Sequence, residues 1–231
     1  MQEALVEVHT GVGGIEAKRW SDDVYQMLLK YSQGNGYQVE ELGRAGECRS
    51  MIVKGKDACE KLQWEAGIHE VQRFPRGEHY GRIHSSTAGV AVLPAADKEG
   101  LDDKDLRIEA SLGMDGLHPS LVVTHLPTGV QAQAESYPSL EEGIEEAMRI
   151  LQIRVGHAQE DQKEGASHLI RQEQLGGGYR AERIRTYNFK EGRVKDHRSG
   201  VLDRNLKRVL DGNLEGLHPE VSDETVYGGG I

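Results

Sequence analysis

The most informative stretch of the sequence is LRIEASLGMDGLHPSLVVTHLPTG, residues 106–129. Apolar and polar residues alternate near both of its ends, as they do in strands with one buried face. A glycine-containing break at residues 113–116 separates the two strands, and Pro127-Thr128-Gly129 ends the second strand in a turn. This stretch is therefore predicted to form a hairpin-like pair of strands.

The sequence before this stretch predicts one helix lying across a mostly antiparallel sheet. Strand patterns occur at residues 4–9, 37–42, 51–54 and 82–93. A turn at residues 11–14 leads into a helix whose apolar residues recur at helical spacing. These residues are Trp20, Val24, Met27, Leu28 and Tyr31.

The sequence after it predicts a long helix, a strand and a final helix. Ser139 and Glu142 fit a capping box, which indicates where the long helix starts. Three glycines at residues 176–178 form a loose connection to a strand at residues 184–189. The final helix is expected to align Leu202, Leu206, Val209 and Leu210 and to end at Gly212.

The composition is that of a globular chain long enough to bury a core. No apolar run reaches the roughly 20 residues that span a bilayer, and the N-terminus has no signal-peptide pattern, so no membrane partner is expected. The expected location is the cytoplasm, or an organelle matrix if a transit peptide was removed. Cys48 and Cys59 are expected to stay reduced.

The net charge of −10 is unevenly distributed. Residues 171–208 contain eleven Lys or Arg and five Asp or Glu, a local charge of +6, so the rest of the chain carries −16. Residues 132–165 contain eight acidic and three basic residues, a local charge of −5. Because phosphate contacts depend on the local field, such a chain can bind RNA through its basic part. The alternative is that the arginines are solvated or pair with Glu16, Glu182 or Asp196 inside the protein.

The chain shows no spacing typical of a metal or cofactor site. The histidines are not accompanied by a Cys or carboxylate at ligand spacing, so no metal is expected. The glycines at residues 11–14 precede a helix but lack the Lys-Ser/Thr pair of a phosphate loop, so a simple turn is expected. No cofactor is predicted.

Several blocks of sequence occur together and in order. They are VEVH at 6–9, GGIEA at 13–17, GIHEVQR at 67–73, GRIHSST at 81–87, LRI at 106–108, THLPTG at 124–129 and RIRTYNFKEGRVKDHR at 183–198. In this order they resemble the bacterial-type class I peptide chain release factors, and the resemblance covers nearly the whole chain. The family's N-terminal domain is expected to be missing.

The resemblance implies an α+β fold with a release-factor-like decoding domain and an inserted, smaller α+β domain. The decoding-type domain would comprise residues 1–105 and 172–231, closed by a returning C-terminal strand and helix. The inserted domain would comprise residues 106–171. It is the equivalent of the domain that carries the family's Gly-Gly-Gln tripeptide.

Two loops depart from the family pattern. The family hydrolyses peptidyl-tRNA with Gly-Gly-Gln, whereas the shorter loop here offers Met114, Asp115, Gly116, Leu117 and His118. The family reads stop codons with a tripeptide before the GRIH segment, and that place holds Pro75, Arg76 and Gly77. Gly77 has no hydroxyl to bond a base edge. Both the hydrolysis loop and the codon-recognition loop are therefore expected to be degenerate, with no catalytic residue assigned.

The resemblance and the basic run together predict an RNA-binding surface. Its expected members are Arg73, Arg82, His84, Ser85, Ser86, Thr87, Arg180, Arg183, Arg185, Arg193, Lys195, His197 and Arg198. The expected partner is the ribosome, through rRNA and mRNA in the A site, or another structured RNA.

Three functions stay open from the sequence. The first is an RNA- or ribosome-binding protein without hydrolase activity, acting in translation control or RNA stabilisation. The second is an active termination or ribosome-rescue factor. The third is a non-ribosomal protein-interaction module. The oligomeric state is not predicted.

Overall fold

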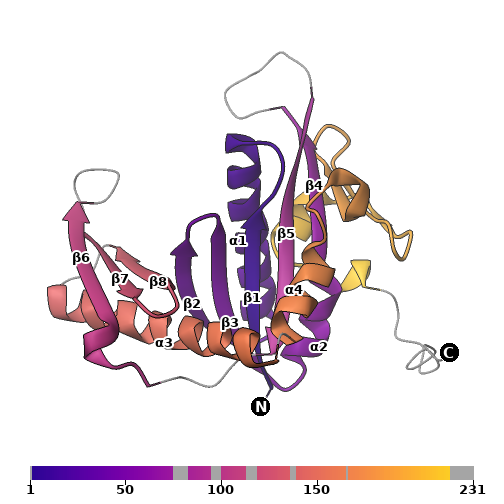
Figure 1. Ribbon diagram of the computed structural model, residues 1–231. Helices are drawn as coiled ribbons and strands as arrows, with labels where there is room; N and C mark the ends of the chain where they lie inside the picture. The colour runs from indigo at the N-terminus through magenta and orange to yellow at the C-terminus, as the bar shows by residue number, and fades with distance from the viewer. Residues whose placement is uncertain are drawn as a thin grey trace.

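The computed structural model describes residues 2–74, 83–94, 100–112, 119–135, 139–164 and 166–218 (Figure 1). It consists of a large sheet, a small sheet and helices that cover them. The predicted α+β class is confirmed. Within these residue ranges no helix is both long and apolar enough to cross a membrane.

Eight strands form the large sheet, in the order β11-β10-β9-β4-β5-β1-β3-β2. Their bounds are β1 (Gln2–Thr10), β2 (Gln38–Ala45), β3 (Cys48–Gly55), β4 (Gly67–Arg73), β5 (His84–Pro94), β9 (Arg183–Asn188), β10 (Arg193–Asp196) and β11 (Leu202–Asp203). Neighbouring strands are antiparallel except β4 and β9, which are parallel. The last three strands thus extend a sheet that the first half of the chain begins.

Helix α1 (Ile15–Gly34) covers one face of this sheet. All five apolar residues predicted for its inner face are buried, and they pack against strand residues such as Val6 and Val90. Burying a side chain of this size contributes about 1.5–3 kcal/mol. The short elements of this half are α2 (Ala58–Leu62), α5 (Leu206–Leu210), η1 (Gln63–Glu65), η3 (Arg180–Glu182) and η4 (Glu215–Leu217).

The final helix was predicted to include Leu202, but it begins later in the chain. Leu202 lies in β11, where it pairs across from Lys195 of β10, and its side chain is 39% exposed. Helix α5 begins at Leu206, after Asn205 caps it by accepting a hydrogen bond from the Arg208 amide. Strand pairing therefore overrides the helical spacing that includes Leu202.

The small sheet lies beside the large one and is covered by a long helix (Figure 1). The strands of the small sheet are β6 (Leu106–Leu112), β7 (Pro119–His125) and β8 (Gln131–Glu135). The short helix η2 (Asp103–Asp105) precedes them, and the helices α3 (Leu140–Glu164) and α4 (Ala166–Leu175) follow them in the chain. The Glu142 amide donates to Ser139 Oγ at 3.2 Å, so Ser139 caps α3 as predicted.

A second core joins the two sheets. Leu151 of α3 packs with Leu121 of the small sheet and with Leu5 and Leu42 of the large sheet. Helix α4 lies against β5, where the Val92 amide donates to Gln174 Oε1 at 2.8 Å. This helix spans the predicted boundary at residue 171. The division into 1–105 with 172–231 and 106–171 stays a prediction.

Candidate nucleic-acid interface

The basic run predicted to face RNA lies on β9 and β10, where side chains alternate between two faces. Arg185 and Asp196 are paired across these strands and are almost fully buried. Lys195, which pairs across from Thr186, is exposed, and so is Arg193. The strand period therefore divides the run into an inner and an outer set.

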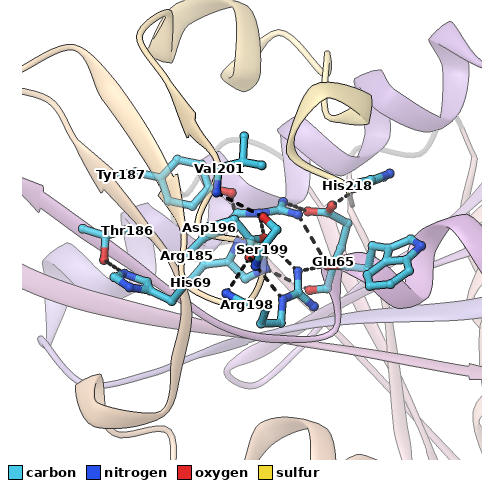
Figure 2. A network of polar contacts seen from close by, with 12 residues as sticks. Glu65, His69, Arg185, Thr186, Tyr187, Asp196, Arg198, Ser199, Val201 and His218 are labelled. Carbon is cyan, nitrogen blue, oxygen red and sulfur yellow. Dashed lines mark hydrogen bonds and ion pairs between the residues drawn. The ribbon is translucent and has the colours of Figure 1, made fainter. Parts of the chain in front are cut away.

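The inner set is a buried ion-pair network (Figure 2). Arg185 donates to the Glu65 carboxylate and, through Nε at 2.9 Å, to Asp196. Asp196 also accepts from Arg198 Nη2 at 2.9 Å, and Glu65 lies 2.8 Å from Nε2 of His218. Two guanidinium groups thus face two carboxylates, so each buried charge has a partner.

This network keeps both carboxylates charged. Burial alone raises the pKa of Glu65, but the charge of Arg185 and the bond to His218 outweigh it and lower that pKa to about 2. Burial also opposes ionisation of Asp196, yet its bonds to Arg198 and the charge of Arg185 hold its pKa well below the usual value. The expectation that Arg185 contacts RNA is corrected, because its guanidinium is enclosed by these partners.

A neutral histidine links the network to α1. Burial lowers the pKa of His69 to about 4, so its imidazole is uncharged at neutral pH. The hydrogen-bond partners assign its proton: Nε2 donates to the Glu65 carbonyl oxygen at 2.9 Å, and Nδ1 accepts from the Tyr187 hydroxyl at 3.0 Å. Trp20 Nε1 donates to the His69 carbonyl oxygen at 2.9 Å. These bonds fix β4, β9 and α1 relative to one another.

The outer set forms a basic surface that we call the β9–β10 outer face. Its members are Arg180, Arg183, Arg193, Lys195 and His197. Arg198, also predicted to contact RNA, is partly exposed, but it is bound to Asp196 and to the Trp64 carbonyl oxygen in the inner network. Lys195 has no hydrogen-bond or ion-pair partner among the residues that the structure describes. Arg193 pairs with nearby Glu191, and Arg183 lies 3.1 Å from Glu70. Partial burial and the charges of Arg183 and Lys195 lower the pKa of His197, so it adds no charge at neutral pH.

The start of β5 adjoins this face. His84 is exposed and Ser85 is half-buried, and Arg180 donates to the Ser85 carbonyl oxygen. Strands β4 and β9 separate β5 from β10, so His84 lies three strand spacings, about 14 Å, from the line of β10. Phe189, 36% exposed, follows β9, and its amide donates to the Gln72 carbonyl oxygen at 3.0 Å. Phe189 packs against Trp20 of α1 and Arg73, and His84 pairs across from Arg73, so both rings lie on the α1 side of the sheet, at the same end as the outer face.

The expected RNA contact by Arg73 is also corrected. Its side chain is 6% exposed, and it donates through Nε to Glu16 at 2.5 Å and through Nη1 to Asp23 at 2.6 Å. The guanidinium carbon lies 5.1 Å from the ring centroid of Phe189. Arg73 therefore joins β4 to α1 instead of reaching solvent.

Ser86 and Thr87 are corrected as well, because both are buried and support the glycine turn before α1. Thr87 Oγ1 accepts from the Val12 amide at 2.8 Å and donates to the Gly178 carbonyl oxygen at 3.1 Å. Gly13 has a φ of 137°, and a Cβ added there would lie 2.3 Å from Ser86 Oγ. The Thr87 hydroxyl is therefore used inside the protein, and Ser86 is enclosed beside the turn.

The two degenerate loops lie outside the described residues. These expectations concern Met114, Asp115, Gly116, Leu117 and His118 in one loop and Pro75, Arg76 and Gly77 in the other, and Arg82 is also outside. They stay predictions. The strand register does fix what joins β6 to β7: Leu112 pairs with Pro119, so six residues, 113–118, connect them.

The two described arginines of α3 are engaged inside the protein, whereas Arg107 of β6 is exposed and lies 3.8 Å from Glu109. Arg149 donates to Glu146 and to Glu40 of β2. Arg154 donates to the carbonyl oxygens of Gln131 at 2.7 Å and Leu42 at 2.9 Å. The first turn of α3 exposes Glu141 and Glu142. This part of the surface is acidic, in contrast to the β9–β10 outer face.

The partners that keep Arg185 inside could not be predicted from local sequence. Glu65 is 120 positions away from it, in a single 3-10 turn without a recognisable motif, and His218 lies beyond the last helix. The one available signal was the alternation of RIRTYN, which places Arg185 on the same face as Tyr187.

Two domain families match the chain: the PCRF domain over residues 1–90 and the RF-1 domain over residues 119–198. Peptide chain release factor 1 of Borreliella burgdorferi (strain ZS7) is 36% identical over 228 residues, 92% of this chain and 64% of that protein. Peptide chain release factor 1 of Thermotoga maritima is 38% identical over 229 residues, 92% of this chain and 67% of that protein. The chain therefore spans about two thirds of the length of these relatives.

A solved structure is similar over the same extent. RF2 of Thermus thermophilus superposes with a TM-score of 0.70 at 30% sequence identity, covering 94% of this chain and 66% of that one. The similarity thus includes both sheets and is not confined to the large one.

Proposed function

Because this chain belongs to the class I peptide chain release factor family, we propose that it binds the ribosome through the β9–β10 outer face and does not hydrolyse peptidyl-tRNA. It would act as a translation factor that occupies its site on rRNA or mRNA, or as a stabiliser of another structured RNA. The proposal has two parts, binding and absence of hydrolysis, and different observations support them.

The contrast between the two halves of the surface supports the binding part. The outer face presents exposed cations, of which Lys195 has no partner among the described residues. Phosphate contacts are favoured by such a local positive field even when the whole chain carries −10. Exposed His84, at the same end of the sheet, offers a ring on which an unpaired base could stack.

The connection between β6 and β7 supports the second part of the proposal, the absence of peptidyl-tRNA hydrolysis. Its six residues contain no Gly-Gly-Gln, and such a connection extends at most about 12 Å beyond the strand ends. Asp115 adds a negative charge there, and exposed Glu141 and Glu142 begin the nearby helix. Moving this acidic end among rRNA phosphates would be opposed by like-charge repulsion.

Co-sedimentation with ribosomes tests the binding part. We expect the chain to pellet with ribosomes at low salt and to be released as salt rises, because counterion release drives phosphate binding. The double variant Arg193→Ala with Lys195→Ala should bind more weakly, whereas Lys104→Ala, an exposed lysine next to Asp102, should not change binding. No co-sedimentation at low salt would instead support the non-ribosomal interaction module.

The second candidate is an active termination or rescue factor, and the identity to proteins named peptide chain release factor 1 favours it. Release of labelled peptide from stop-programmed and stalled ribosomes separates the two candidates. We expect no release above the buffer control. Release that disappears when Gly116 is changed to Ala would refute the non-hydrolytic proposal and support the enzyme.

A further inference from the structure

A pocket with a cluster of charged and metal-ligating side chains lies on the face of the large sheet opposite α1, far from the β9–β10 outer face in the strand order. Its volume is about 320 Å³, and residues of β1, β3, α3 and α4 line it. Most of its walls are apolar or neutral, but Glu7, His9 and Cys48 gather on its sheet side, with Arg154 and Arg171 opposite. This group of side chains has no part in the RNA-binding proposal.

The register of two strands brings the three side chains together. Glu7 and His9 are two positions apart on β1, so they share a face, and Cys48 of β3 pairs directly across from His9. His9 Nε2 lies 3.0 Å from Glu7 Oε2 and 3.6 Å from Cys48 Sγ, and the three ligand atoms all lie within 4.8 Å of one another. The arrangement is set by main-chain pairing inside a sheet, not by a loop.

We propose that Glu7, His9 and Cys48 bind one Zn²⁺ ion, with water in the fourth position. A thiolate, an imidazole and a carboxylate form the donor set that Zn²⁺ accepts, and three protein ligands with one open position make a tetrahedral site. Zn–S and Zn–N bonds of about 2.3 and 2.05 Å require an S···N separation of about 3.6 Å. The separation in the protein is 3.6 Å.

The Glu7 ligand must move away from His9 to bind. Tetrahedral N and O ligands at about 2.05 and 2.1 Å lie about 3.4 Å apart, so the 3.0 Å separation of Glu7 Oε2 from His9 Nε2 must widen by about 0.4 Å. The carboxylate oxygen is already within 4.8 Å of the other two ligand atoms. Arg171 donates to both carboxylate oxygens of Glu7, at 2.7 and 3.1 Å. A carboxylate has further lone pairs on each oxygen, so Arg171 can keep these bonds while Glu7 binds the metal, as outer partners of ligating carboxylates do.

The two arginines decide which cation fits. Arg154 is anchored by the Gln131 and Leu42 carbonyl oxygens, so its charge stays at the pocket wall, and Arg171 is held by Glu7. Their charges disfavour Ca²⁺ or Mg²⁺, which bind mainly through oxygen ligands. A metal that forms a strong bond to a thiolate can offset this repulsion. Burial opposes protonation of His9, but its bonds to Cys48 and Glu7 outweigh it and raise the pKa of His9 to about 10, so its imidazole is protonated in the metal-free protein. Binding through the Cys48 thiolate and the neutral His9 imidazole therefore releases one proton from each side chain to solvent, and affinity should rise with pH.

Cobalt titration of the full chain tests the site, because Co²⁺ bound to a thiolate gives a charge-transfer absorption that other ligands do not. The chain has two cysteines, Cys48 and Cys59, and both are free thiols. We expect one equivalent of Co²⁺ to produce the band and one equivalent of Zn²⁺ to displace it. Cys48→Ser should abolish the band, whereas Cys59→Ser, a matched thiol on α2, should retain it.

A second variant keeps the test decisive if Cys48→Ser folds poorly. His9→Asn retains both thiols and should weaken Co²⁺ and Zn²⁺ binding by about tenfold or more. Circular dichroism of each metal-free variant checks that the fold is kept. The proposal is overturned if the native chain gives no thiolate band, if the band survives Cys48→Ser, or if His9→Asn binds as tightly as the native chain. None of these outcomes depends on whether the protein binds ribosomes.

Discussion

Replacing Arg185 with methionine should strongly destabilise the protein although the new side chain is apolar and of similar length. Arg185 is 0% exposed, and its removal leaves Glu65, also 0% exposed, with His218 as its remaining ionisable partner. Breaking a buried ion pair on one side costs about 3–5 kcal/mol, because the other charge stays in a medium that solvates it poorly. The cost at Asp196 is smaller, because Asp196 keeps its ion pair with Arg198.

The pKa of Glu65 gives an independent magnitude. It falls from 4.5 to about 2 on folding. At about 1.4 kcal/mol for each unit, this carboxylate contributes about 3 kcal/mol to the free energy of unfolding. Because the folded-state pKa is the lower one, the contribution is present above 4.5 and is lost as the pH falls toward 2. The difference between the native chain and Arg185→Met should therefore shrink on acidification, since a protonated Glu65 needs no cation.

Urea unfolding followed by circular dichroism at neutral pH and at about pH 3 measures both quantities. We expect Arg185→Met to lower the free energy of unfolding by about 3 kcal/mol at neutral pH and by less at acidic pH. Adding Glu65→Gln should recover part of the loss, because the double variant no longer buries the unpaired carboxylate. A loss below about 1 kcal/mol, or a loss that is the same at both pH values, would refute the reasoning.

Three further variants separate surface from interior. Lys195→Ala should leave the free energy of unfolding within about 0.5 kcal/mol of the native value. It should also reduce the slope of log K for ribosome binding against log salt concentration by about one unit. An unchanged slope would show that Lys195 is not part of the interface. Gly13→Ala should destabilise by about 1–3 kcal/mol in urea, because its φ of 137° and the approach to Ser86 both exclude a Cβ. Gly34→Ala, at the end of α1 with open space around it, is the matched control and should be neutral or slightly stabilising, because alanine favours the helix. Thr87→Val should cost about 1–3 kcal/mol in the same assay, since it leaves a main-chain amide and a carbonyl without their partner; a neutral result would mean that water replaces the hydroxyl.

Local patterns predicted the elements of this fold well where one face is buried. The helix at Trp20 to Tyr31 and the cap at Ser139 follow from spacing alone, since both depend on neighbours within a few residues. The Leu202 error has the same origin. Its spacing fits a helix, but pairing with β10 decided its conformation, and no local pattern contains that partner.

The candidate sites were harder to predict because their partners are distant in sequence. Charge counting placed Arg185 and Lys195 in one basic run, yet strand alternation sends one inward and the other outward. The proposed metal site was not predicted from the sequence for a related reason. Glu7 and His9 are close in sequence, but Cys48 reaches them through the pairing of β1 with β3, a register that spacing along the chain does not reveal.

The buried and the exposed cations of this protein allow its proposed binding function to be separated from its stability. The buried Arg185 holds β9 and β10 to the sheet, so its loss should weaken RNA binding only by unfolding the surface, and with no special dependence on salt. The exposed Lys195 should act in the opposite way, on binding and its salt dependence but not on folding. If removing Lys195 lowered stability and left binding unchanged, the outer face would be part of the scaffold, and the RNA-contacting surface would have to lie elsewhere on the chain.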